Sequence, residues 1–163
     1  MNGVASSSRL LFCAAFAALA LPARAADLSA AAAADLKRAF AAGRQSTSEE
    51  PAVRAERARG EPSAGFMIGA ALGAWSAARA QLDYDLKNPA AAGPPHASQG
   101  APVDEALDQD CREEKTAFDR LEERSRAQGL DPAAVVAAAG GLDPALLDAW
   151  RFRRDHASAC TAG

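Results

Sequence analysis

The sequence predicts an all-α protein, a small alanine-rich helical bundle. Alanine, the strongest helix former, is abundant, whereas β-branched residues are scarce and no run alternates apolar with polar residues. Leucine, isoleucine, valine and phenylalanine together stay below the roughly 20 % that ordinarily supports a globular core. Because alanine buries little area, such a bundle needs closely packed helices and benefits from a covalent link.

Residues 1–25 have the pattern of a signal peptide. A polar lead precedes an apolar run at 10–21, and small residues at Ala23 and Ala25 form a cleavage site. The apolar run is shorter than the roughly 20 residues that span a bilayer. We therefore expect cleavage near Ala25 or Ala26 and a periplasmic or secreted protein.

Cleavage changes both the charge and the cysteine count. Of 18 lysines and arginines, Arg9 and Arg24 are removed, which leaves 16 against 21 acidic residues and a net charge of −5 in place of −3. An acidic chain lacks the basic surface of a nucleic-acid-binding protein. Loss of Cys13 leaves Cys111 and Cys160, and an even pair in an exported protein predicts one disulfide.

The N-terminal helical half is expected to cover residues 26–87. An alanine-rich helix over 28–42 is followed by Gly43, a residue typical of helix ends. The charged stretch 44–62 reads as a polar linker or exposed face, in which Ser48 is placed to cap a short helix.

A more apolar helix is predicted from a cap at Ser63 to about Leu86. Apolar side chains recur along it at helical spacing and define a core face. Arg79 falls in this stripe, and its stem is expected to lie along the indole of Trp75. The stripe consists of Ile68, Leu72, Trp75, Leu82 and Leu86.

Small residues form a ridge beside that stripe, at Gly65, Gly69, Gly73 and Ala77. Glycine costs helix stability, so its repetition predicts that another backbone approaches closely. We expect tight packing inside a bundle. The alternative, helix 64–86 acting at a membrane, stays open because the same spacing marks helix association in bilayers.

Repeated proline and glycine predict a linker over 88–103, followed by a C-terminal unit over 104–163. Its first helix is expected to run to about Gln128. Glu114 is the one charged residue on an otherwise largely apolar stripe, which comprises Leu107, Cys111, Phe118, Leu121 and Ser125.

A five-residue repeat, Gly-Leu-Asp-Pro-Ala, occurs at 129–133 and again at 141–145. Each copy supplies a glycine after a helix, an aspartate cap and a proline at the first helical position. The repeat predicts two helix breaks around a short helix over 132–139. A last helix then runs from Pro144 to about Ala159.

The two cysteines are expected to clasp an antiparallel C-terminal hairpin. Each lies 16 or 17 residues from the connecting end, or about 25 Å along a helix. A disulfide between them would stabilise the fold by roughly 4 kcal/mol, less any strain. In this register Trp150 lies near Leu121. Glu114 faces Arg153 or His156, which predicts a partly buried ion pair.

The segment Trp150-Arg-Phe-Arg-Arg-Asp155, followed by Cys160, resembles part of the LprI-like lysozyme-inhibitor family. The resemblance covers residues 104–160 and implies a small exported helical domain whose cysteine helices are clasped. It also implies inhibition of a lysozyme-type cell-wall hydrolase. Cys160 comes two residues later than the family pattern expects.

We find no catalytic constellation in the sequence. His96 lies in the linker and His156 in the last helix, neither beside a nucleophile. There is no Cys-x-x-Cys, no phosphate loop and no zinc-protease motif. We therefore expect no enzyme, no cofactor and no metal site.

The sequence favours an exported interaction or accessory protein that binds another exported or envelope protein, with its oligomeric state open. The alternatives are a hydrolase inhibitor and an envelope-associated protein that uses helix 64–86. The candidate interaction or packing surface comprises Gly65, Gly69, Gly73, Trp75, Arg79, Trp150, Phe152, Arg153 and Arg154.

Overall fold

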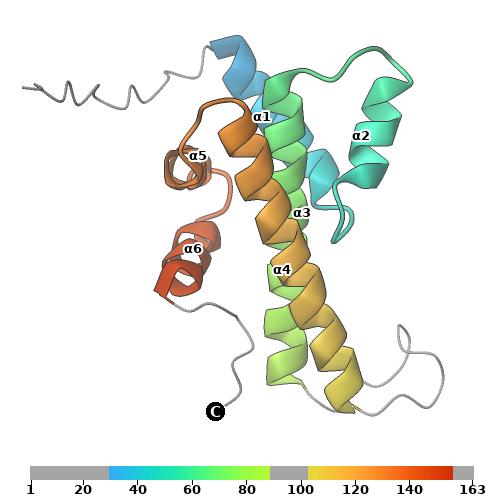
Figure 1. Ribbon diagram of the computed structural model, residues 1–163, viewed down its shortest axis with the longest axis vertical. Coiled ribbons are helices and arrows are strands. Elements are labelled where there is room, and N and C mark those ends of the chain that lie inside the picture. Colours follow the sequence, from blue (N-terminus) through green and yellow to red (C-terminus); the bar gives the residue numbers. More distant parts are fainter. Residues whose placement is uncertain (1–29, 89–102, 156–163) are drawn as a thin grey trace, which may run out of the picture.

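The computed structural model describes residues 30–88 and 103–155, and within these ranges the chain forms six helices joined by turns, with no strand (Figure 1). The predicted signal peptide, His96, His156 and Cys160 lie outside the described residues. The all-α class is confirmed. The helices are α1 (Ala30–Gly43), α2 (Glu50–Arg57), α3 (Ala64–Lys87), α4 (Val103–Ala127), α5 (Pro132–Ala139) and α6 (Ala145–Asp155).

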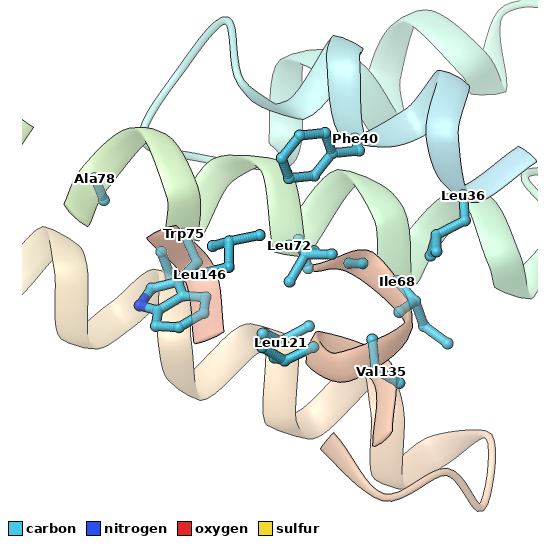
Figure 2. Packing of buried hydrophobic residues seen from close by; sticks show 13 residues of the cluster. Leu36, Phe40, Ile68, Leu72, Trp75, Ala78, Leu121, Val135 and Leu146 are labelled. Atoms are coloured by element: carbon cyan, nitrogen blue, oxygen red, sulfur yellow. The ribbon is translucent and has the colours of Figure 1, made fainter. Parts of the chain in front are cut away.

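The two longest helices, α3 and α4, lie side by side and run in opposite directions (Figure 1). Helix α1 packs along α3, and the short helices α5 and α6 lie on one side of the α3–α4 pair. The main core takes side chains from all of these elements (Figure 2). Helices from both sides of the predicted linker therefore share one core. Its labelled members are Leu36, Phe40, Ile68, Leu72, Trp75, Ala78, Leu121, Val135 and Leu146.

Glycines set the distance between α1 and α3. A Cβ on Gly69 would lie 2.6 Å from the carbonyl oxygen of Leu36, and one on Gly73 would overlap the carbonyl of Phe40. Reciprocally, a Cβ on Gly43 would overlap the carbonyl of Ala70. The predicted close approach of a second backbone is confirmed, and that backbone is α1.

The charged stretch 44–62 contains more than the linker we expected. Val53 of α2 is fully buried, in a second small apolar cluster with residues of α1 and α3. Glu49 is also buried and accepts a hydrogen bond of 2.8 Å from Nη2 of Arg124. The apolar side of this short helix thus docks it onto the bundle.

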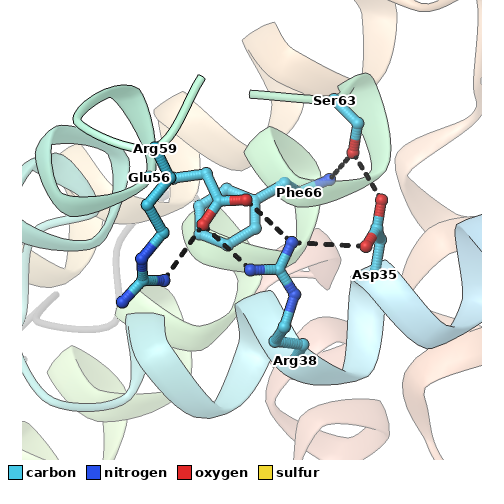
Figure 3. Close-up of polar contacts among 6 residues, drawn as sticks. All are labelled: Asp35, Arg38, Glu56, Arg59, Ser63 and Phe66. Atoms are coloured by element: carbon cyan, nitrogen blue, oxygen red, sulfur yellow. Dashed lines mark hydrogen bonds and ion pairs between the residues drawn. The ribbon is translucent and has the colours of Figure 1, made fainter. Parts of the chain in front are cut away.

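Arg38 ties α1 to α2 at the surface (Figure 3). Its guanidinium donates to both carboxylate oxygens of Glu56, at 2.9 and 2.8 Å, and to Asp35 at 3.3 Å. The hydroxyl of Ser63 donates to Asp35 as well, at 2.8 Å, and it also caps α3 by accepting from the amide of Phe66. Hydrogen bonds from Ser63 and Arg38 lower the pKa of Asp35, and those from Arg38 lower the pKa of Glu56.

Both copies of the Gly-Leu-Asp-Pro-Ala repeat break helices as predicted. Asp131 accepts from the amide of Ala133, and α5 has the predicted bounds. Asp143 accepts from the amide of Ala145 and so caps α6. The copies differ at their first residue: Gly129 has a positive φ of 68°, whereas Gly141 has no positive φ.

We had expected the last helix to be the long antiparallel partner of α4. That expectation was wrong, because the partner is α3. Large side chains separate α6 from α4: the rings of Trp150 and Phe118 lie 5.4 Å apart, and Arg153 reaches Glu114. These two contacts still run in antiparallel order. Trp150 meets Phe118, one helical turn from the predicted neighbour Leu121.

One expectation for α3 was wrong: Leu86 was placed on the core stripe, yet it is exposed near the helix end. The charge of Arg79 reaches Asp83, and its guanidinium lies over the ring of Phe152 of α6. No helix within residues 30–88 and 103–155 is long and apolar enough to cross a membrane.

Candidate functional site

A polar cluster lies inside the bundle. The indole nitrogen of Trp75 donates to Oε1 of Glu114 at 2.8 Å, and Oε2 of Glu114 lies 3.7 Å from Nε of Arg153. The side chains of Glu114 and Arg153 are 1 % and 4 % exposed. The predicted ion pair is therefore present, and it is more deeply buried than expected. Because a buried charge is costly without a partner, this cluster fixes how α3, α4 and α6 meet.

Three aromatic rings enclose the cluster. Trp75 contacts Phe118 and Trp150 edge to face, with ring centroids 5.4 and 6.4 Å apart. The guanidinium of Arg153 lies over the ring of Phe118 at 5.1 Å. Such contacts add stability beyond the area that they bury. This region holds the fold together.

A groove of about 400 Å³ lies between α3 and α6, nearer the surface than this buried cluster. We call it the α3–α6 groove. Ala80 and Ala149 from facing helices, with Ala145 and Leu146, give it an apolar floor. Phe152, 39 % exposed, stands in its wall. The remaining lining residues are polar: Ser76, Arg79, Asp83, Asp143 and Asp148.

Arg79 is held firmly in this groove. Its Nη2 donates to Asp83 at 2.7 Å, and its guanidinium lies 5.2 Å above the centroid of Phe152. Nε and Nη1 are buried, and neither has a hydrogen-bond partner within the described part of the chain. The side chain is only 17 % exposed. Arg79 therefore joins α3 to α6 more than it presents charge to solvent.

Asp143 closes one end of the groove. Besides capping α6, it accepts a hydrogen bond of 2.9 Å from the hydroxyl of Ser76, and it lies 3.9 Å from Nη1 of Arg44. Sequence reasoning identified Asp143 only as a cap. Its second contact joins residues 67 positions apart, and no local pattern could have revealed it.

The nine predicted surface residues do not form one surface. Gly69 and Gly73 are buried against α1, while Gly65 lies near the start of α3 and is partly exposed. Trp75, Trp150 and Arg153 point into the interior, and Arg154 is exposed and pairs with Asp155 at 3.0 Å. The groove brings together Arg79 and Phe152.

Two further hollows adjoin the bundle. One, of about 170 Å³, lies between the start of α2 and helices α3 and α4, and includes the buried Glu49. The other is a shallow trough that shares Ala80 with the α3–α6 groove and extends it toward Arg44. In residues 30–88 and 103–155, no three His, Cys, Asp or Glu side chains converge as metal ligands.

The α3–α6 groove offers an apolar floor, an exposed aromatic ring and carboxylates, which is a set of contacts for binding. No protein-family model, no curated protein and no solved structure matches this chain.

Proposed function

We propose that the protein is an exported helical binding module that recognises another exported or envelope protein through the α3–α6 groove. The observation that carries this proposal is the exposed ring of Phe152 above an apolar floor in the α3–α6 groove. Aromatic residues in apolar pockets are typical anchors of protein interfaces. The volume of about 400 Å³ lies within the range of ordinary ligand sites.

The scaffold under the groove supports this function. Phe152 and Ala149 belong to α6, the helix that Arg153 fixes through Glu114 and that Trp150 fixes through two aromatic contacts. The wall of the groove is thereby positioned before a partner arrives. A pre-positioned site loses less entropy on binding, and so binds more tightly.

Export and a disulfide clasp complete the proposal. An N-terminal segment with signal-peptide character supports export, and an even cysteine pair then favours a bond between Cys111 and Cys160. The thiol of Cys111, in α4, is not free. The contacts of α6 with α4 run in antiparallel order as far as Arg153, as a clasp at Cys111 requires. Titration of the unfolded, unreduced exported protein should detect no thiol, and two thiols would contradict the clasp.

Site-specific photo-crosslinking in the native cells tests the groove itself. A photoreactive phenylalanine analogue replaces Phe152, and the control carries it at Ala55, an exposed residue of α2 on the other side of the bundle (Figure 1). We expect one defined protein adduct from position 152 and none from position 55. Equal adducts from both positions, or none from 152, would contradict the proposal. An adduct with a lysozyme-type hydrolase would specify an inhibitor.

A further inference from the structure

The charges that the α3–α6 groove presents to solvent are acidic. The side chains of Asp83 and Asp148 are 40 % and 83 % exposed, whereas Arg79, the one basic residue in the lining, is 17 % exposed. Two of the three guanidinium nitrogens of Arg79 are fully covered. Among the residues that line the groove, the exposed charges are therefore carboxylates.

The carboxylates are spaced along the groove. Ser76 of α3 contacts Asp143, which lies just before α6. Arg79, three residues later in α3, contacts Phe152 near the end of α6. Helices α3 and α6 therefore run in the same direction along the groove. Asp143 lies at one end, and Asp148 lies along the α6 wall between Asp143 and Phe152.

Existing partners leave these carboxylates available. Asp148 pairs with Arg151 at 3.1 Å, but both side chains are largely exposed, and such a pair contributes little free energy. Asp83 uses Oδ1 for Arg79, and a carboxylate accepts several hydrogen bonds. A basic group entering the groove can therefore bind Asp148 by displacing Arg151, and can add to the contacts of Asp83.

We propose that the α3–α6 groove binds a lysine or arginine side chain carried by an apolar segment of the partner protein. The aliphatic stem lies on Ala80, Leu146 and Ala149, and the cation reaches the carboxylates of Asp83 and Asp148. Long basic side chains bury their stems in this way while their charge stays at a polar rim. The inference rests on the proposed function and adds the chemical class of the partner.

Binding of model peptides tests this assignment. The probes are the capped heptapeptides Ala-Leu-Ala-Lys-Ala-Leu-Ala and its arginine and glutamate counterparts, added to the purified ¹⁵N-labelled protein. We expect the basic peptides to shift the amide signals of residues 79–83 and 145–152. The glutamate peptide should leave these signals unchanged. Stronger binding of the glutamate peptide, or no shift with the basic ones, would overturn the assignment.

Matched variants locate the charge. Asp148→Asn should weaken binding of the lysine peptide roughly twofold to fivefold, as expected for an exposed ion pair. Asp83→Asn should act similarly, and the control Asp119→Asn, on the outer face of α4, should have no effect. Unchanged binding in Asp148→Asn would overturn the proposal even if Asp83→Asn is unstable. A specific adduct from position 152 together with that result would leave the proposed function intact.

Discussion

The indole nitrogen of Trp75 donates a hydrogen bond of 2.8 Å to Glu114 in the interior of the bundle. Because the same carboxylate lies beside Arg153, one side chain of α4 connects α3 with α6. The groove that we propose as a binding site is the outer surface of that same α3–α6 junction. Its geometry therefore depends on a buried charge.

Replacing Glu114 should destabilise the protein strongly. Glu114→Ala removes the acceptor of Trp75 and a partner of buried Arg153, and loss of one member of a buried pair typically costs about 3–5 kcal/mol. The control Glu123→Ala removes an exposed carboxylate of the same helix and should stay within about 0.5 kcal/mol. Urea unfolding of both variants measures the difference, and equal stabilities would show that the buried cluster is not structural.

The α1–α3 packing predicts a second effect. A methyl group at Gly73 would meet backbone atoms, which cannot rotate away as a side chain can. Gly73→Ala should therefore lower the free energy of unfolding by roughly 1–3 kcal/mol or more, as overpacking of a core does. Thermal unfolding checks this. A Gly73→Ala protein as stable as the wild type would mean that α1 can move away from α3 without cost.

The two copies of the Gly-Leu-Asp-Pro-Ala repeat provide a matched pair of substitutions. Gly129→Ala should destabilise the protein by roughly 1–2 kcal/mol, because a residue with Cβ is strained at its φ of 68°. Gly141→Ala meets no atom within 4 Å and needs no positive φ, so it should be neutral or slightly stabilising. Denaturant midpoints compare the two, and equal losses would contradict the asymmetry.

The Arg38 cluster predicts acid sensitivity. The pKa values of Asp35 and Glu56 are lowered from ordinary values of 3.8 and 4.5, so both carboxylates stabilise the fold when ionised. That contribution is complete above about pH 5 and is lost as pH falls through the lowered folded-state values. When the pH is lowered from 6 into the acidic range, the melting temperature of Arg38→Met should therefore fall less than that of the wild type. Parallel curves for the two proteins would argue against it.

Local chemistry explains which parts of the fold could be predicted. The bounds of α5 follow from an aspartate cap and a proline within one repeat, and the cap at Ser63 follows from the same rules. The glycine ridge of α3 predicted a close neighbour but could not identify α1. Helix pairing depends on how whole faces fit together, so α3 replaced α6 as the long partner of α4.

The candidate site was predictable only in part, for the same reason. Arg79 and Phe152 were selected from the sequence, yet their contact joins helices separated by most of the C-terminal half. The second role of Asp143 depends on Ser76, which no nearby residue indicates. The sequence placed Trp75 on the core stripe and Arg153 near Glu114, but it could not show that one buried carboxylate joins the two.

The most direct test of the account is to fill the α3–α6 groove and measure binding of the partner identified by crosslinking from position 152. Ala80 is exposed and lines the groove, so Ala80→Trp should occupy it without disturbing the core. The control Ala55→Trp places the same ring on α2. By isothermal titration calorimetry we predict roughly tenfold weaker binding or more for Ala80→Trp, and wild-type binding for the control. Wild-type affinity in a folded Ala80→Trp protein would show that the partner does not bind in the α3–α6 groove.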